Sequence, residues 1–242
     1  MRGKFGLLLA CCLVLGGRAA AGEAEDVVDK AIRAHGGADK LARVKQMQRS
    51  DTGTLSLGGG AAPFKDELTV DLPQRYRLDL VYGPQKTNIT VVVNPAGGWQ
   101  VTGGGAAELG KERLHEQREE MYVLYVQTLV PLRKERGFTL TSLPDAKVQG
   151  RKAAGVKVVS KGHIDVRLYF DKDSGKLVKV SRTLPVAGLS LEKDTLLSDY
   201  KRFGGVELPT RIVEYDNGSK TAEIKSATYS FPRITEKMFA RP

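Results

Sequence analysis

The residue types that most often carry chemistry are few in this sequence and far apart. The three histidines, His35, His115 and His163, share no short spacing of the kind that zinc ligands show. Each is therefore interpreted as a surface residue. The sequence has no Gly-x-Ser-x-Gly elbow and no phosphate loop that ends in lysine and a hydroxyl residue. We therefore expect a protein that is not an enzyme, with no catalytic residue, no metal and no cofactor.

Two groups of acidic residues have simpler explanations than catalysis or metal binding. Glu116, Glu119 and Glu120 could form an acid pair, but their basic neighbours favour a solvated, ion-paired helix surface. The segment Asp171–Gly175 is similar to the start of a calcium loop, yet it lacks the later ligands and the closing glutamate. Aspartate and glycine are the residues that a hairpin turn needs, so a turn is expected there.

Most of the chain alternates polar and apolar residues, as strands with one buried face do. Arg75–Leu80 and Ile164–Phe170 both show this period of two. Turn residues join the strands to their neighbours, and Asn217-Gly218 within Asp216–Ser219 is the strongest hairpin signal. We expect a mainly β protein, with a single curved antiparallel sheet of about ten or eleven strands.

Helical periodicity is confined to the start and the middle of the chain. Glu25–Ala34 and Ala38–Val44 predict two N-terminal helices, the first ended by His35 and two glycines. Lys111–Leu132 predicts a central helix that Pro131 ends. Its second half also has strand character. The glycines of 103–105 are interpreted as a flexible linker into this helix.

The central helix is charged in its first half and almost wholly apolar in its second half. Its apolar end must therefore be covered. Packed against the concave face of the sheet, the helix would be a plug or lid, and the alternative is a helix that merely closes one open end of a barrel. The candidate cavity residues are the apolar members of this helix and the one tryptophan, Trp99, Leu114, Met121, Leu124, Tyr125 and Leu129. Ordinary core packing would use the same residues.

The first 21 residues have the pattern of a secretory signal peptide. Basic residues precede an apolar core, Phe5–Leu15, and Ala19–Ala21 supplies small residues for cleavage before Gly22. The apolar run is too short for a membrane span, which needs ~20 residues. Lipid attachment at Cys11 is the less favoured alternative, because cleavage there would leave too short an apolar core. We expect a periplasmic or secreted protein that loses both cysteines with the signal.

Removal of the signal takes away three basic residues and no acid, so the formal net charge of +10 falls by three. The mature chain stays basic, but an exported protein rarely meets nucleic acid, so no nucleic-acid partner is expected. Residues 22–242 fit one domain of the all-β kind. We expect this domain to be a monomer without a transmembrane segment.

The layout of the mature chain resembles the LolA/LolB-like superfamily, whose members include periplasmic lipoprotein-sorting proteins. The matching pieces are strand, turn and helix signatures in chain order: Ala34–Leu41, Gly53–Leu55, Pro63–Lys65, Asp71–Leu78, Tyr169–Leu177, Gly205–Ile212 and Phe231–Pro242. The resemblance implies a half-barrel in which helices cover the concave face of the sheet and enclose an apolar cavity.

The resemblance also implies binding without catalysis. The expected partner is a lipid or another hydrophobic ligand, and a lipid or lipoprotein carrier is one such use. An acyl chain offers ~0.8 kcal/mol per buried methylene and needs few polar contacts. The alternative is an envelope protein that binds or regulates another protein and has a filled, ligand-free barrel.

Overall fold

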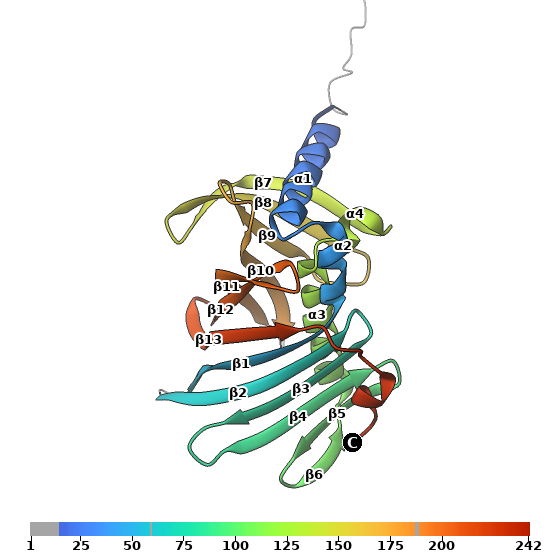
Figure 1. Cartoon of the computed structure of the whole chain (residues 1–242), viewed down its shortest axis with the longest axis vertical. Helices are drawn as coiled ribbons and strands as arrows, with labels where there is room; N and C mark the ends of the chain where they lie inside the picture. Colours follow the sequence, from blue (N-terminus) through green and yellow to red (C-terminus); the bar gives the residue numbers. More distant parts are fainter. Residues whose placement is uncertain (1–14, 59, 187–188) are drawn as a thin grey trace, which may run out of the picture.

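The computed structural model of the 242-residue chain describes residues 15–58, 60–186 and 189–242. Its strands form one antiparallel sheet in the order β6-β5-β4-β3-β2-β1-β13-β12-β11-β10-β9-β8-β7. Neighbouring strands in the sheet are also neighbours in the chain, except where β1 pairs with β13. The sheet is therefore two meanders joined along one strand pair, and it is open, with β6 and β7 as its edges (Figure 1).

The strands of the first meander end before the central helix, and those of the second begin after it. They are β1 (Gln46–Leu57), β2 (Gly60–Asp71), β3 (Arg75–Tyr82), β4 (Thr87–Asn94), β5 (Gly97–Thr102) and β6 (Gly105–Glu108), then β7 (Phe138–Val148), β8 (Arg151–Ser160), β9 (Val166–Asp171), β10 (Leu177–Val186), β11 (Leu189–Phe203), β12 (Val206–Asp216) and β13 (Ser219–Ser230).

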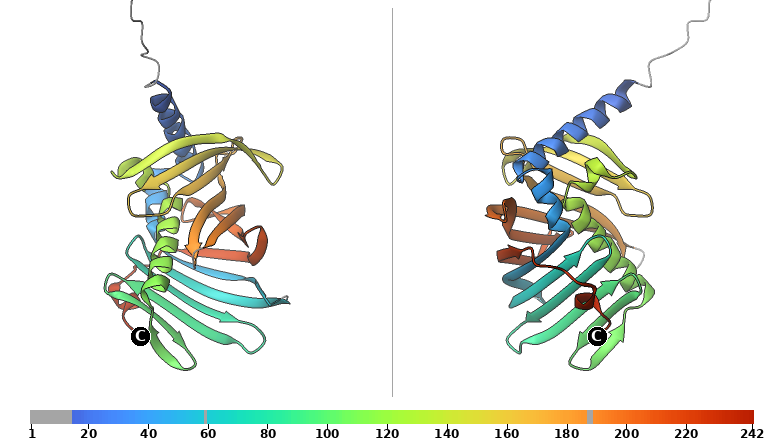
Figure 2. Two further views of the ribbon diagram at one scale, coloured as in Figure 1. Left: turned by 180° about the vertical axis from the view of Figure 1, so that it is seen from behind. Right: turned by 45° about the vertical axis from the view of Figure 1, so that its right-hand side comes forward.

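The helical segments lie at three places in the chain. They are α1 (Leu15–Ala34), α2 (Ala38–Leu41) and the 3-10 turn η1 (Ala42–Lys45), then α3 (Lys111–Gln127) and α4 (Pro131–Lys134), then the 3-10 turn η2 (Glu236–Phe239). Helix α1 packs against β7 and β8. Helix α3 runs across the strands on the concave side of the sheet (Figure 2).

Local chemistry explains a hairpin and a bend that shape the sheet. Asn217 and Gly218 have φ of 46° and 78°, the two positive values of the type I′ turn that joins β12 to β13. The β1–β13 register shifts at Thr52 and Gly53. A Cβ atom at Gly53 would lie 2.0 Å from the Glu223 carbonyl oxygen, so only glycine fits this close strand approach.

The two faces of the sheet are covered differently. The main apolar core lies between the concave face and the helices, and this core includes Leu68, Val126 and Leu168. On the convex face, Val92 and Trp99 pack against Phe239 of η2, so the C-terminal segment covers β4 and β5 there. The main core thus lies on the face of the sheet that the helices cover.

Four sequence-based expectations need correction. The sheet has 13 strands, not ten or eleven. The expected linker at residues 103–105 turns instead into the exposed edge strand β6, which backbone hydrogen bonds to β5 hold without apolar alternation. Helix α1 begins at Leu15, not Glu25, because the alanines of 19–21 favour helix. Helix α3 ends at Gln127, and Pro131 begins α4, where a first-turn proline is favoured.

The expected signal peptide lies mostly outside the described residues, and so do Cys11 and Cys12. Among the residues that the structure describes, no helix is long and apolar enough to span a membrane.

Candidate functional site

Helix α3 separates two hollows. The first, here called the inner cavity, has a volume of about 500 Å³ and lies between α3 and the concave face of the sheet. The second, here called the outer groove, has a volume of about 370 Å³. Glu120 and Leu124 face the inner cavity, whereas Met121 and Tyr125 face the outer groove. At 3.6 residues per turn these two pairs occupy different sides of one helix.

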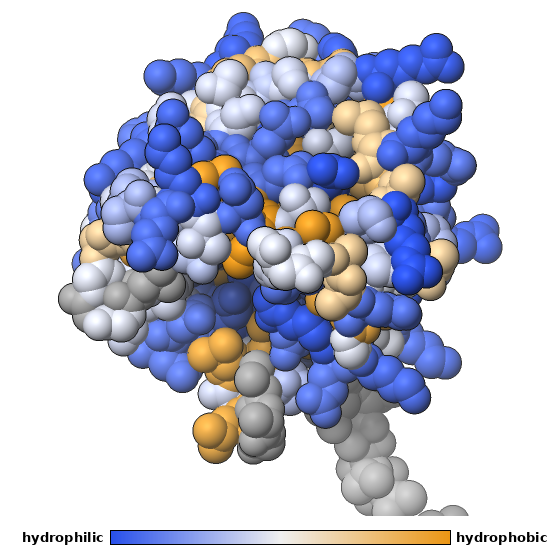
Figure 3. Space-filling model, turned by 90° about the horizontal axis from the view of Figure 1, so that it is seen from below, coloured by the Kyte–Doolittle hydropathy of each residue, from blue (hydrophilic) through white to orange (hydrophobic). Residues whose placement is uncertain are grey.

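One wall of the inner cavity is apolar. The strands of both meanders supply it together with Leu124 of α3: Leu55, Phe64, Leu68, Tyr76, Leu78, Leu80, Leu184, Leu191, Ala222 and Ile224. These residues alternate along their strands with outward-facing ones, so the period of two in the sequence builds this wall. Seen from the end where β6 lies, apolar groups show in recesses between charged ones (Figure 3).

A network of charges ties α3 to the opposite wall of the inner cavity. The Glu120 carboxylate lies 2.5 Å from Arg182 Nη2 and 3.5 Å from Lys193 Nζ. Burial by itself opposes ionisation of Glu120, but the two cations outweigh it and lower the pKa of this carboxyl. The Arg182 side chain is only 4% exposed, so Glu120 is the counter-ion that makes its burial tolerable.

A second charged group is a pair of aspartates beside the inner cavity, of which Asp66 lines the cavity and Asp51 is buried behind it. Asp51 of β1 and Asp66 of β2 stand directly opposite each other, which places their Cβ atoms about 5 Å apart. Arg49 Nε donates to Asp51 Oδ2 at 2.7 Å. Asp51 Oδ1 and Asp66 Oδ1 are both buried and receive no donor from another described residue. Burial and the neighbouring Asp51 raise the pKa of Asp66 to about 8, so a proton held between them supplies the donor.

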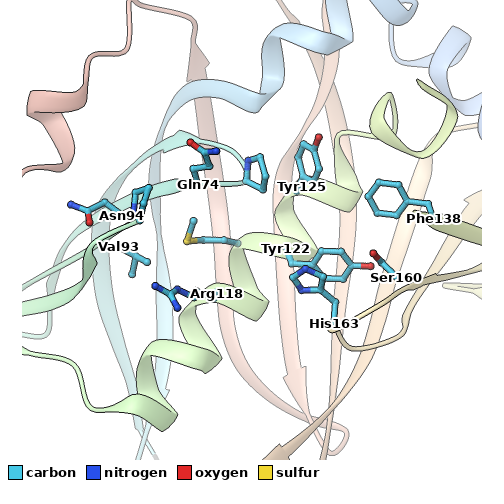
Figure 4. A pocket seen from close by; sticks show the side chains of 12 residues that line it. Gln74, Val93, Asn94, Arg118, Tyr122, Tyr125, Phe138, Ser160 and His163 are labelled. Atoms are coloured by element: carbon cyan, nitrogen blue, oxygen red, sulfur yellow. The ribbon is translucent and has the colours of Figure 1, made fainter. Parts of the chain in front are cut away.

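The outer groove is lined mainly by aromatic and apolar side chains from α3 and from both meanders (Figure 4). The rings of Tyr122 and His163 are stacked, with centroids 4.0 Å apart and planes 7° from parallel. His163 Nδ1 lies 3.0 Å from Glu119 Oε1, and the Ile164 backbone N–H donates to Glu119 Oε2 at 2.9 Å. Glu119 therefore fixes both the ring and the loop that carries it.

The structure divides the six candidate cavity residues among five places. Met121 and Tyr125 line the outer groove, and Leu124 lines the inner cavity. Leu114 packs at the edge of the main core beside Gly98. Leu129 is buried in that core, 1% exposed. Trp99 lies on the convex face.

The expectation of surface histidines and solvated glutamates is wrong at two positions, His35 and Glu119. His35 is buried, its Nδ1 lies 2.7 Å from the Ala31 carbonyl oxygen, and burial lowers its pKa. His163 is exposed, as expected, but it has a partner in Glu119, whose side chain is only 3% exposed. The spacing of the sequence gives no signal for the two contacts of Glu119, because they join residues 44 and 45 positions apart.

Sequence reasoning also missed the charged residues of the inner cavity, Arg49, Asp66, Arg182 and Lys193. Each occupies a position in a strand that faces the cavity. A charged residue where the strand pattern expects an apolar one was therefore the sequence signal that could have identified them. Among the described residues, no cluster of three or more His, Cys, Asp or Glu side chains could hold a metal ion.

An open, curved antiparallel sheet with a helix across its concave side, and a cavity between them, is a half-barrel fold. Comparison with solved structures shows that this fold is similar to that of proteins described as members of the LolA superfamily. A LolA superfamily protein from Nitrosomonas europaea superposes with a TM-score of 0.57 at 10% identity, over 90% of this chain and 97% of that chain. The resemblance noted in the sequence is thereby confirmed for the fold.

Two further structures agree in fold. An outer membrane lipoprotein-sorting protein domain from Vibrio parahaemolyticus gives a TM-score of 0.55 at 11% identity, and a DUF1329 family protein from Desulfovibrio piger gives 0.57 at 11%. Both comparisons cover 90% of this chain and 97% of the other. No protein-family model and no curated protein sequence matches the chain.

Proposed function

We propose that this protein is an exported binding protein that holds a lipid or another hydrophobic ligand in the inner cavity and does no chemistry on it. The observation that carries the proposal is the apolar wall of a cavity of about 500 Å³. This volume lies within the usual range of ligand pockets, roughly 300 to 1,000 Å³. Each methylene buried against the wall would contribute about 0.8 kcal/mol.

The charged side of the inner cavity supports a ligand that has a polar end. Lys193 is 23% exposed and Glu214 also lines the cavity, so a head group has polar contacts available while its chain lies along Leu78 and Leu80. A lipid has this division between an apolar body and a polar head. One solved relative in fold is described as an outer membrane lipoprotein-sorting protein domain, and carriage of lipids or lipoproteins is the use that we propose.

The aspartate pair does not argue for catalysis. A protonated carboxyl beside a carboxylate is a known acid–base arrangement. However, Asp51 is 1% exposed and its other oxygen is bound to Arg49, so it does not face a substrate. Asp66 is better explained as part of the wall of a binding cavity, with Asp51 buried behind it.

The test is lipid binding by the purified mature protein. Lipids extracted from the protein would be identified by mass spectrometry, and affinity would be measured with a fluorescent fatty acid. Ala222→Phe places a ring in the inner cavity and should weaken binding at least about tenfold. Ser190→Phe, at an exposed strand position, is the matched control and should not.

Failure of the proposal would be clear. A protein that carries no extractable lipid and binds no fluorescent fatty acid does not have this function. Recovery of one specific envelope protein in a pull-down by such a ligand-free protein would favour the alternative, a protein-binding or regulatory module.

A further inference from the structure

We propose that the outer groove is a second binding site, distinct from the inner cavity, for a small anionic ligand. This ligand would combine an aromatic or alkyl body with one carboxylate, sulfonate or phosphate group. The two sites lie on different sides of α3 and share no lining residue. The inference therefore does not depend on the function proposed for the inner cavity.

The floor of the outer groove suits the apolar body of such a ligand. Met121, Tyr122 and Tyr125 of α3 are buried beneath it, and Val93 and Phe138 extend it on both sides. Figure 4 shows these side chains converging from α3, from the first meander and from the second. A groove of about 370 Å³ has room for a molecule of one or two rings.

Arg118 supplies the charge at the rim. Its side chain lines the groove, and it forms no salt bridge with any acid in the part of the chain that the structure describes. The nearest acid in the sequence, Glu119, is already committed to His163 and to the Ile164 backbone. A guanidinium donates hydrogen bonds and accepts none. The N–H donors of Arg118 at the rim are therefore suited to an anionic group of a ligand.

The stacked pair of Tyr122 and His163 adds a flat wall to the groove. Because His163 Nδ1 faces Glu119, Nδ1 carries the hydrogen of this ring and Nε2 is left for a ligand. The His163 side chain is 39% exposed, which gives a ligand access to the outer part of the ring. An aromatic ligand would stack or pack edge-on here, as aromatic pairs commonly do.

The experiment uses two fluorescent probes that differ in charge. Anilinonaphthalene sulfonate has an aromatic body and one anionic group, and phenylnaphthylamine has a similar body without the charge. Arg118→Gln should raise the Kd of the sulfonate probe about tenfold and leave that of the neutral probe within about twofold. Arg113→Gln is the matched control, because Arg113 lies on the same helix but lines the inner cavity.

The outcomes separate this site from the inner cavity. Ala222→Phe should leave the Kd of the sulfonate probe unchanged, even where it abolishes fatty-acid binding. The inference is overturned if the sulfonate probe does not bind the folded protein, if Arg118→Gln leaves its Kd unchanged, or if Arg113→Gln weakens it as much as Arg118→Gln does. Far-UV circular dichroism and retained binding of the neutral probe show that Arg118→Gln is folded.

Discussion

The aspartate pair beside the inner cavity makes the stability of the protein depend on pH in a defined direction. The pKa of Asp66 rises from an ordinary 3.8 to about 8 on folding, because of burial and the facing Asp51. An acid with a raised pKa binds more protons in the folded state than in the unfolded state. Its favourable contribution is therefore complete below about pH 4 and is lost as the pH rises through about 8.

Asp66→Asn should remove this dependence. A pKa difference of this size is equivalent to roughly 6 kcal/mol if nothing relaxes. Asp66 keeps some solvent contact and can move on ionisation, so we expect about 2 kcal/mol. At pH 9 the variant should be more stable than the wild type by about 2 kcal/mol, because the introduced amide donates to Asp51 without adding charge. At pH 5 the two should agree within about 0.5 kcal/mol.

The assay is urea unfolding of both proteins between pH 5 and pH 9, followed by circular dichroism. Groups common to both proteins cancel in the difference of unfolding free energy. Glu67→Gln, at the neighbouring exposed position of β2, is the control and should give a flat difference. A flat difference for Asp66→Asn as well would show that the two aspartates do not share a proton.

Three further predictions concern α3, the sheet and the N-terminus. Glu120→Ala leaves Arg182 buried without its counter-ion and should lower the free energy of unfolding by about 2 to 3 kcal/mol in a urea titration. Glu116→Ala is the control: it removes a more exposed ion pair and should lower that free energy by less than about 0.5 kcal/mol. Gly53→Ala should destabilise the protein by about 2 kcal/mol or more in thermal unfolding, because the new Cβ atom would clash with Glu223 and Phe64. Gly103→Ala is the control and should be nearly neutral, because no other atom lies near the position of its Cβ. N-terminal sequencing of the exported protein should begin at Gly22, and a lipid-blocked N-terminus at Cys11 would contradict that expectation.

The meander was predictable because its signals are local. Alternation in Arg75–Leu80 and the Asn217-Gly218 turn each report on a few neighbouring residues, and the structure has a strand and a type I′ turn there. Strand β6 was missed because an exposed edge strand needs only backbone hydrogen bonds to β5, and its sequence of small residues carries no alternation. Local patterns do not report on such pairing.

The candidate site was less predictable, because it depends on which residues meet across the sheet. The helical spacing of Met121, Leu124 and Tyr125 identified α3, but it did not show that this helix separates two hollows. The Glu120–Arg182 contact joins residues 62 positions apart, and the Asp51–Asp66 pair depends on strand register. Pairings of this kind follow from tertiary structure alone.

The central claim is that a hydrophobic ligand lies between α3 and the apolar wall of the inner cavity. A crystal structure of the protein soaked with a brominated fatty acid tests this most directly, because anomalous scattering locates the bromine. The account predicts a bromine peak within the inner cavity, beside Leu78 and Leu124. A cavity that holds no bromine, while the compound is bound on the outer surface of the protein or not at all, would contradict it.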